Sequence, residues 1–272
     1  MPVLTVLSIN IWDLPITLPG TRRRLRRRRL LERLPAMDAD LVLLQEAFRP
    51  SLRAALAEVM HGYHADALLG AKRRWGPITL DASGGLLTFT RWPVLGTRYE
   101  PSLAVRGMKL DERIGRKGVL WTVIDTPAGP VTIGNVHLYA GNGPVDARVR
   151  TAQTGRIVRG AARAAEPIII AGDFNIAREA EIPDRGRSAF DVLARAGFEE
   201  VADGTSAGLE TMDPRRNRWA RYAPWHRPAR RLTHMFYRGA GVRQRGVPRV
   251  VLDDPPVSDH FGLLATFVCS SD

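Results

Sequence analysis

The chain has 272 residues, of which 44% are hydrophobic and 25% charged, a composition that is typical of a soluble globular protein and excludes disordered, collagen-like and coiled-coil classes. Its formal net charge of +12 favours polyanionic partners such as nucleic acid, an anionic membrane surface or a phosphorylated substrate. All but three of the 40 basic residues are arginine, however, and such a skew also follows from genome base composition.

Short apolar runs rich in β-branched residues predict strands along the whole chain. They lie at residues 3–11, 41–44, 84–90, 119–124, 131–138, 167–171, 231–237 and 261–268. Stretches with apolar residues at helical spacing predict helices at residues 22–34, 50–60, 145–165 and 188–196. Because helices and strands mix throughout, with about ten strands, we expect an α/β protein with paired sheets in a single domain over residues 1–272.

The first predicted helix, over residues 22–34, is unusually rich in arginine. Leu25, Leu30, Leu31 and Leu34 would form its apolar stripe, and Thr21 would cap its N-terminus. An arginine run of this kind is found in nucleic-acid-binding helices, but a solvated helix face explains it equally simply. We favour the solvated face.

Polar residues gather at the ends of the apolar strands. The set consists of Asn10, Glu46, His137, Asp173, Asn175, Asp259 and His260. Each residue by itself fits a strand cap, a helix cap or an Asx turn. A buried strand holds the groups at its end rigidly, as a preorganised site requires, so the combined set predicts a functional site.

The residue types in this set indicate the chemistry of the site. Its three carboxylates and two asparagines offer oxygen ligands, which suit Mg²⁺, with Mn²⁺ as an alternative. Mg²⁺ keeps several waters and leaves room for a substrate phosphate. The two histidines exchange protons or donate to phosphate oxygens near neutral pH. A divalent ion with histidines is a reasonable set for cleaving a phosphodiester, because the ion neutralises charge that develops on the phosphate.

Five motifs in this order resemble the endonuclease/exonuclease/phosphatase superfamily. They are Asn10, Gln45-Glu46, Asn135-Val136-His137, Gly172-Asp173-Phe174-Asn175 and Ser258-Asp259-His260. The resemblance extends over essentially the whole chain and implies a four-layer α/β sandwich, with two mixed β-sheets packed face to face and helices on both outer sides. It also implies metal-dependent hydrolysis of a phosphoester at the sheet edge. Residues 84–94, 117–120, 210–212 and 257–266 look most similar to neutral sphingomyelinase-like members.

The resemblance implies which residues hold the ion and the substrate. Glu46 would be the main metal ligand, with Asp259 beside the metal and Asn10 nearby. Asn10 and Lys117 would also contact the substrate, together with His137 and the asparagine at position 175.

The resemblance likewise implies the catalytic roles. Asp173 and Asn175 would position the attacking water and the phosphate, and His137 would stabilise the transition state. His260 would be the general base or the principal phosphate contact. Both Asp173 and His260 are plausible acceptors of the water proton, and the sequence leaves the two open.

Two positions depart from the family pattern. Thr233 stands where an aspartate commonly orients the catalytic histidine, and a hydroxyl orients more weakly and adds no charge. This departure raises the prospect of altered or reduced activity. An acidic residue also precedes the Lys117-Gly118 element in sphingomyelinase-like proteins, but the spacing does not decide between Asp111 and Glu112.

Candidate surface contacts with the substrate lie in two segments that interleave basic and aromatic residues. Residues 215–227, and Trp75 with residues 72–74, would suit nucleic acid or an anionic lipid headgroup layer, although a surface loop whose aromatic residues pack inward is an equally good explanation. No long hydrophobic hairpin is evident, so strong membrane insertion is not supported.

The sequence therefore leaves three functional hypotheses. The first is a Mg²⁺-dependent phosphodiesterase of the sphingomyelinase or phospholipase C kind, and the second is a Mg²⁺-dependent DNA or RNA nuclease. The third is a catalytically weakened binding protein on the same fold. We expect a monomer. A cytoplasmic location is the default, since no run approaches the roughly 20 apolar residues of a membrane span and no signal peptide is evident. The single cysteine, Cys269, excludes an intrachain disulfide and a cysteine-based zinc site, which also fits a reducing compartment.

Overall fold

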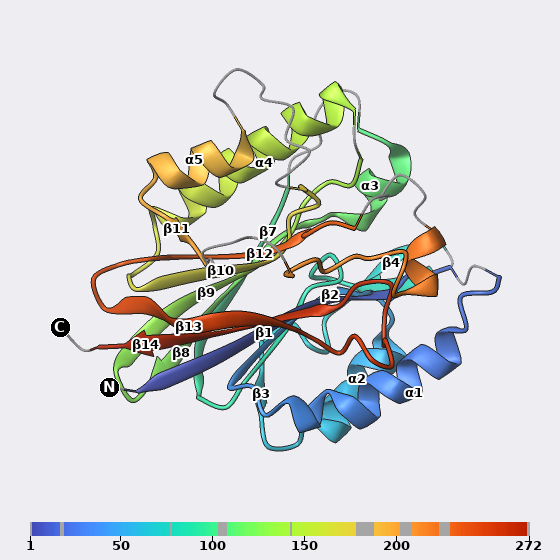
Figure 1. The fold of residues 1–272 in the computed structure, drawn as a ribbon, viewed down its shortest axis with the longest axis horizontal. Helices are drawn as coiled ribbons and strands as arrows, with labels where there is room; N and C mark the ends of the chain where they lie inside the picture. The colour runs from blue at the N-terminus through green and yellow to red at the C-terminus, as the bar shows by residue number, and fades with distance from the viewer. Residues whose placement is uncertain are drawn as a thin grey trace.

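Two six-stranded β-sheets pack face to face, and helices cover both outer sides (Figure 1). The structure is a computed structural model and describes residues 2–16, 19–76, 78–102, 108–141, 143–177, 188–201, 208–222 and 229–270. The two sheets are mixed, because each has one parallel strand pair among antiparallel neighbours. This arrangement confirms the predicted four-layer sandwich.

The first sheet has the strand order β13-β14-β1-β2-β6-β3. Its strands are β1 (Val3–Asp13), β2 (Leu41–Ala47), β3 (His64–Ala65), β6 (Leu87–Thr90), β13 (Val242–Val251) and β14 (Gly262–Cys269). The helix α1 (Arg23–Arg33) and the short 3-10 helix η1 (Pro35–Met37) connect the parallel strands β1 and β2, and α2 (Pro50–Val59) follows β2. α1 and α2 lie together on the outer face of this sheet (Figure 1).

The second sheet has the strand order β11-β12-β10-β9-β8-β7. Its strands are β7 (Val94–Pro101), β8 (Gly118–Thr126), β9 (Gly129–His137), β10 (Ile168–Asp173), β11 (Glu199–Glu200) and β12 (Thr233–Arg238). The helix α4 (Pro144–Ala161) connects the parallel strands β9 and β10 and packs with α5 (Ala189–Arg195) on the other outer face (Figure 1). Further elements are α3 (Leu110–Gly115), the 3-10 helix η3 (Arg218–Tyr222) and the ribbon β4 (Lys72–Trp75) with β5 (Ile78–Asp81).

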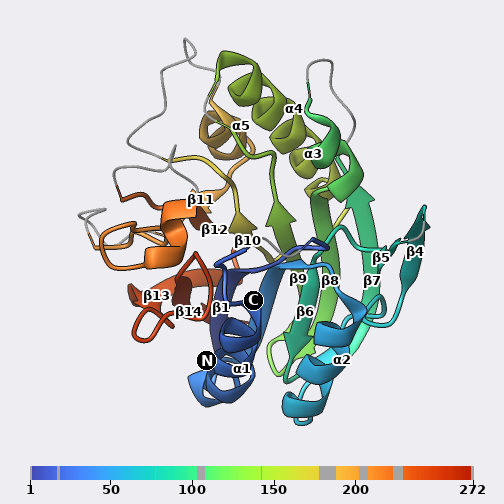
Figure 2. The same ribbon diagram turned by 90° about the vertical axis from the view of Figure 1, so that its right-hand side faces the viewer.

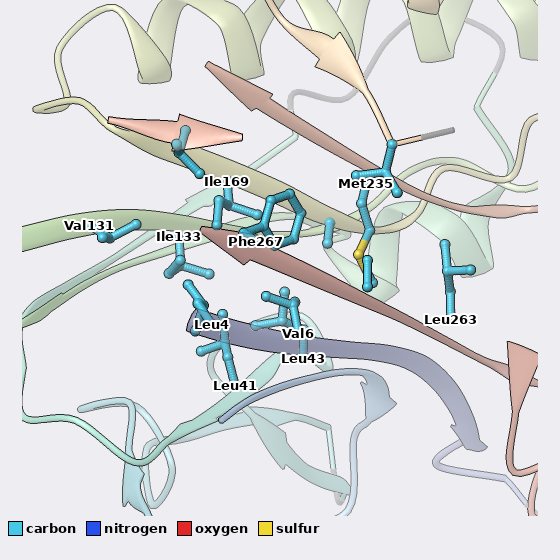
Figure 3. Close-up of a cluster of buried hydrophobic side chains, with 14 of the residues drawn as sticks. Leu4, Val6, Leu41, Leu43, Val131, Ile133, Ile169, Met235, Leu263 and Phe267 are labelled. Carbon is cyan, nitrogen blue, oxygen red and sulfur yellow. The ribbon is translucent and has the colours of Figure 1, made fainter. Parts of the chain in front are cut away.

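The central core fills the space between the two sheets (Figure 3). Leu4, Val6 and Leu43 from the first sheet meet Ile133 and Ile169 from the second, all fully or almost fully buried. Alternate residues of the same strands point to the helices instead, since successive side chains of a strand face opposite sides. Central strands such as β2 and β10 are therefore buried on both faces, which explains why they read as continuous apolar runs.

Several predicted boundaries were wrong for identifiable reasons. The strand predicted from residue 84 begins only at Leu87, because Gly84 and Gly85 have φ of +63° and +79° and form a turn. Thr21 does not cap α1; Arg22 is the N-cap residue, in a left-handed conformation without a side-chain cap. The long helix ends at Ala161 rather than at residue 165.

The described residues form fourteen strands, more than the ten or so expected. The missed strands include β4, β7 and β13, which are rich in charged or polar residues. They lie at sheet edges or in the separate ribbon, where a strand is stabilised by pairing with a neighbour and carries little apolar signal. Within the same described ranges, no helix combines the length and apolar character that crossing a bilayer requires.

Candidate functional site

The space between the sheets changes from apolar to polar toward one edge. Along β1 the side chains that face the other sheet are Leu4, Val6, Ser8 and Asn10, and along β9 they are Val131, Ile133, Asn135 and His137. On β2 and β10 the same face ends in Gln45 and Asp173. Because β1 and β2 are parallel, as are β9 and β10, their carboxyl ends meet at one edge of the sandwich, onto which Figure 2 looks. The site predicted from strand ends is therefore one place in space.

Asn10 connects the two sheets at this edge. Its Nδ2 donates to Glu46 Oε1 at 3.0 Å and to Asp173 Oδ2 at 2.9 Å. Its Oδ1 accepts a hydrogen bond from the backbone N–H of Trp12 at 3.0 Å. With the amide in this orientation, Asn10 holds two carboxylates together, while its predicted roles as a metal ligand and substrate contact stay predictions.

Glu46 reaches the site only because the backbone of β2 bends. By strand alternation its side chain would face α1 and α2 with those of Val42 and Leu44, but φ of 58° turns it toward Asn10. Left-handed backbone is unfavourable for a residue with a Cβ, and such strain is concentrated at functional sites. Gly85 makes room, because a Cβ there would lie 3.1 Å from the Glu46 Cα.

Burial makes ionisation of the Glu46 carboxyl group energetically unfavourable. Desolvation raises its pKa from 4.5 to about 7, and repulsion by Asp259 adds to this, while the charge of Lys117 and the Asn10 hydrogen bond act against it. Its Oε2 is buried and has no hydrogen-bond partner in the described part of the chain. A carboxylate oxygen that is buried and unpartnered is suited to bind a cation.

Asp173 and the two histidines lie together opposite Glu46. His137 Nε2 is 3.7 Å from Asp173 Oδ2 and 3.8 Å from Glu46 Oε1, and His260 Nε2 is 3.9 Å from Asp173 Oδ2. Burial lowers the pKa of His137 well below 6.5, and the charge of Lys117 lowers it further, so this imidazole is neutral. Burial by itself would raise the pKa of Asp173, but His260, His137 and the Asn10 hydrogen bond outweigh it and the pKa falls.

The Gly-Asp-Phe-Asn motif forms a tight turn at the end of β10. The backbone N–H of Asn175 donates to Asp173 Oδ1 at 2.9 Å, and Asn175 Nδ2 donates to the Leu138 carbonyl at 3.0 Å. Gly172 is required because a Cβ there would overlap the carbonyl oxygen of Val136 on the adjacent strand. These contacts fix Asp173 and Asn175, and contact of Asn175 with a phosphate stays a prediction.

The Ser-Asp-His motif precedes β14 and is anchored from a distant segment. Asn217 Nδ2 donates to the Ser258 carbonyl at 2.8 Å, and the N–H of Phe261 donates to the Thr211 carbonyl at 2.7 Å. Burial raises the pKa of Asp259, while His260 and the guanidinium of Arg26 lower it. No local sequence pattern connects Asn217 to this motif, so only the folded structure identifies it as a supporting residue.

Lys117 extends toward the carboxylates and is paired with Glu112. Lys117 Nζ lies 2.9 Å from Glu112 Oε1, and both side chains are buried or nearly so. Burial alone would lower the pKa of Lys117, but Glu112 and Glu46 outweigh this effect and raise it, so the ammonium is charged. Glu112, one of the two acidic residues that the sequence left undecided, thus pairs with Lys117, whereas the side chain of Asp111 lies outside what the structure describes. The predicted contact of Lys117 with substrate stays a prediction.

Thr233 lies where the departure from the family pattern is expected to matter. It pairs with Asp173 across β10 and β12. Its Oγ1 and His260 Nδ1 are both buried, and neither has a hydrogen-bond partner among the residues that the structure describes. A buried polar atom without a partner is energetically unfavourable, as expected if the usual carboxylate has been lost here.

Two further buried groups support the site, and neither has a role predicted from sequence, although Gln45 and Asn135 stand within the family motifs. Gln45 Nε2 donates to Asn135 Oδ1 at 2.8 Å, and Asn135 Nδ2 donates to the carbonyls of Leu44 and Leu87, so an amide pair ties the two sheets together directly below Glu46. On α1, Arg26 is buried and was wrongly assigned to a solvated face. The amide pair is recognisable in the sequence as polar residues within otherwise apolar strands. No sequence pattern indicates which of the seven arginines of α1 is buried.

The donor set fits a divalent cation chemically. Glu46 and Asp259 are buried carboxylates whose charges repel each other, and a cation between them would offset both the repulsion and the desolvation. In the described ranges no three His, Cys, Asp or Glu side chains are already gathered as a complete ligand set. Mg²⁺ takes only one or two protein carboxylates and keeps waters, so an incomplete protein set is compatible with it.

Two sequence-predicted contacts lie partly outside the described residues. The interleaved segment at 215–227 is described only to residue 222, and the side chain of Trp75 is not described. In the described part, Trp219 is buried and Tyr222 is 43% exposed, so this segment combines inward-packed and surface aromatic residues.

Such a sandwich, with carboxylates, histidines and asparagines gathered at the carboxyl edge of its parallel strands, defines a class of phosphoester hydrolases. The sequence profile of the Endonuclease/Exonuclease/phosphatase family matches residues 7–260. The chain belongs to this family, whose members hydrolyse phosphoesters. A comparison with curated proteins finds no significant match.

Solved structures with the same fold include sphingomyelinase-like proteins and TDP2. Beta toxin from Staphylococcus aureus is 18% identical to this chain, and the match covers 96% of this chain and 99% of the toxin, with a TM-score of 0.76. Another beta toxin structure, with bound magnesium ions, is also 18% identical; the match covers 99% of this chain and 100% of the toxin, with a TM-score of 0.71. Sphingomyelinase C from Streptomyces griseocarneus is 18% identical, and the match covers 98% of this chain and 99% of that one, with a TM-score of 0.64. TDP2 from D. rerio carrying 14 humanising mutations is 18% identical, and the match covers 97% of this chain and 98% of that one, with a TM-score of 0.68. At these identities the likeness establishes the fold.

Proposed function

We propose that this protein is a divalent-metal-dependent phosphodiesterase that uses Mg²⁺. The observation that carries the proposal is the convergence of Glu46, Asp173 and His260 at one buried edge, from positions far apart in the chain. Family membership and the magnesium ions in a beta toxin structure support it.

The residues that would hold the ion are Glu46 and Asp259. When bound, the ion would supply positive charge that stabilises the charge developing on the phosphate and the leaving oxygen. The unpartnered Oε2 of Glu46 is the atom that supports this assignment most directly.

The remaining residues would bind the phosphate and move a proton. The charged Lys117 and the neutral His137 are donors that face the carboxylates, and they would donate to phosphate oxygens. Asp173, which Asn10 and its own turn hold in place, would orient the attacking water, and His260, whose Nε2 lies 3.9 Å from Asp173 Oδ2, would accept the water proton. Thr233 offers no carboxylate to His260 Nδ1, so we expect a slow enzyme.

The substrate class has two candidates. The sphingomyelinase neighbours favour a choline phospholipid as in sphingomyelinase or phospholipase C. A second candidate, a DNA or RNA nuclease, is favoured by a group of arginines at the ends of β1 and β2.

The deciding experiment measures hydrolysis of bis-p-nitrophenyl phosphate with Mg²⁺ or with EDTA. We expect Mg²⁺-dependent release of p-nitrophenol by the wild type, abolished in Glu46→Gln and retained in the matched control Glu58→Gln, an exposed acid on α2. Activity that survives EDTA or Glu46→Gln would disprove the metal assignment. Absence of hydrolysis in every condition, with a folded protein, would favour the binding-protein hypothesis. Plasmid nicking and phosphocholine release from sphingomyelin vesicles then separate the two substrate classes.

A further inference from the structure

The arginines of α1 fall into two groups. This helix contains seven arginines in eleven residues. Arg26, Arg29 and Arg33 donate to backbone carbonyl oxygens of neighbouring segments, and Arg28 lies 3.6 Å from Glu32 on the exposed face. These arginines serve the fold itself. Of the three that remain, Arg24 is exposed, whereas Arg23 and Arg27 are half-buried and of a different kind.

Arg23 and Arg27 of α1, with Arg49 from the start of α2, form a group that we term the arginine cluster. Arg27 makes a two-pronged ion pair with Asp13, with Nε–Oδ1 3.0 Å and Nη2–Oδ2 2.8 Å. Arg49 donates to the carbonyl oxygens of residues 14 and 15. Arg23 Nη1 is shielded from solvent, yet has no partner in the described part of the chain.

The cluster carries more positive charge than its surroundings balance. Burial lowers the pKa of Arg49, and the charges of Arg23 and Arg27 lower it further, against the opposing effect of Asp13. The first turn of α1 contains no acidic residue, so the positive end of the helix dipole adds to the same potential. One carboxylate for three guanidinium groups leaves a repulsion that a bound anion would offset.

The cluster lies beside the carboxylate site. Asp13 is three residues beyond Asn10, at most about 10 Å along β1, and it pairs with Ala47, the residue after Glu46. Arg49 follows Glu46 by three residues. Both α1 and α2 lie under the sheet edge that Figure 2 faces. An anion held here would therefore be part of the substrate whose phosphodiester occupies the carboxylate site.

The aromatic residues beside the cluster indicate what kind of substrate this is. Trp12 and Tyr222 contact each other with ring centroids 5.7 Å apart, and Tyr222 remains 43% exposed. The guanidinium of Arg26 already lies 4.5 Å from the centroid of the Trp12 ring. The quaternary ammonium of a choline lipid would meet positive charge here, whereas a nucleobase stacks on aromatic and guanidinium surfaces while its strand supplies further phosphates.

We propose that Arg23, Arg27 and Arg49 form a second phosphate-binding subsite, which holds a phosphate of a nucleic acid strand next to the phosphodiester at the carboxylate site. The inference rests on the proposed function and deepens it, because it selects nucleic acid over a choline phospholipid. Tyr222 supplies a stacking surface for a base of the same strand.

The test measures binding without cleavage. A short fluorescein-labelled single-stranded oligodeoxynucleotide is titrated with protein in EDTA over a range of salt concentrations, and anisotropy is recorded. Arg23→Gln/Arg49→Gln should weaken binding by about tenfold or more and reduce the slope of log K against log salt by about 0.7 or more, the contribution of one phosphate contact on a single strand. The control Arg24→Gln/Arg28→Gln removes the same charge from the exposed face of α1 and should stay within about twofold of wild type.

The outcomes separate the subsite from the general charge and from catalysis. Equal weakening by both double variants would overturn the proposal, as would cluster-dependent binding to phosphatidylglycerol vesicles without binding to the oligonucleotide. Restored binding in Arg23→Lys/Arg49→Lys, with unchanged thermal unfolding, would support a direct phosphate contact and exclude a folding defect. Failure of the wild type to hydrolyse bis-p-nitrophenyl phosphate, with cluster-dependent oligonucleotide binding intact, would refute the phosphodiesterase alone.

Discussion

Replacing Glu46 by glutamine should stabilise the metal-free protein at neutral and alkaline pH. Glutamine keeps the size of the side chain and the oxygen that accepts the hydrogen bond from Asn10, which is 3.0 Å long. It removes a charge that sits in a site only 13% exposed, where burial raises the pKa of Glu46 to about 7. The variant therefore isolates the energetic cost of placing an ionised carboxylate at this position.

The magnitude follows from the difference in pKa between the folded and unfolded states. The pKa of Glu46 is about 7 in the folded chain and 4.5 for the free side chain. An acid with a raised pKa contributes stability below its unfolded pKa, and that contribution is lost as pH rises through the folded pKa. At about 1.4 kcal/mol for each pH unit, the loss between pH 4.5 and 7 amounts to about 3 kcal/mol. This corresponds to a difference in Tm of about 5–10 °C for a chain of this size.

The assay is thermal or urea unfolding of both proteins in EDTA from pH 5 to pH 8. The free energy of unfolding of the wild type should fall relative to Glu46→Gln by about 2.5 kcal/mol across this range, since part of the loss has already occurred by pH 5. Titration of other groups is common to both proteins and cancels in the difference, and Glu58→Gln should follow the wild type. Added Mg²⁺ should restore wild-type stability at pH 8 and leave Glu46→Gln unchanged, because only binding to the folded state stabilises. Parallel curves for the two proteins would refute the reasoning.

Three further substitutions test individual contacts. Asn10→Ala should lower the rate of hydrolysis by about 100-fold, because Glu46 and Asp173 lose the hydrogen-bond donor that they share. Initial rates with saturating Mg²⁺ measure this effect, and a rate near wild type would show that the shared hydrogen bonds of Asn10 are dispensable. Glu112→Gln should raise KM for bis-p-nitrophenyl phosphate more than it lowers kcat, since Lys117 loses its ion pair at 2.9 Å and its fixed position; an unaltered KM would argue against Lys117 as a phosphate contact. Thr233→Asp should raise kcat by about tenfold or more if the new carboxylate reaches His260 Nδ1, and an unchanged pH–rate profile would mean that the two side chains do not touch.

The strand pattern predicted the fold and most of the residues at the candidate site. Apolar runs such as residues 168–171 are buried on both faces, and burial on both faces is what makes a strand recognisable without alternation. The same pattern missed the edge strand β13, whose arginines and glutamine are stabilised by pairing with β14 rather than by burial. Local sequence also could not predict the ion pair of Glu112 with Lys117, because it depends on how the folded chain brings the two side chains together.

The sequence by itself determined which functional groups are present and at which strand ends they stand, because a polar residue that closes a buried apolar run is visible in one dimension. Only the tertiary structure decided that these ends share one edge, since parallel pairing across α1 and α4 is a long-range event. It also decided the direction of Glu46, which strand alternation assigns to the wrong face and a left-handed residue turns back. Burial and neighbouring charges, which exist only in the folded chain, then lowered the pKa of His137 and raised that of Glu46. The fold also separated the arginines of α1 that donate to backbone carbonyls, such as Arg26 and Arg29, from Arg23 and Arg27.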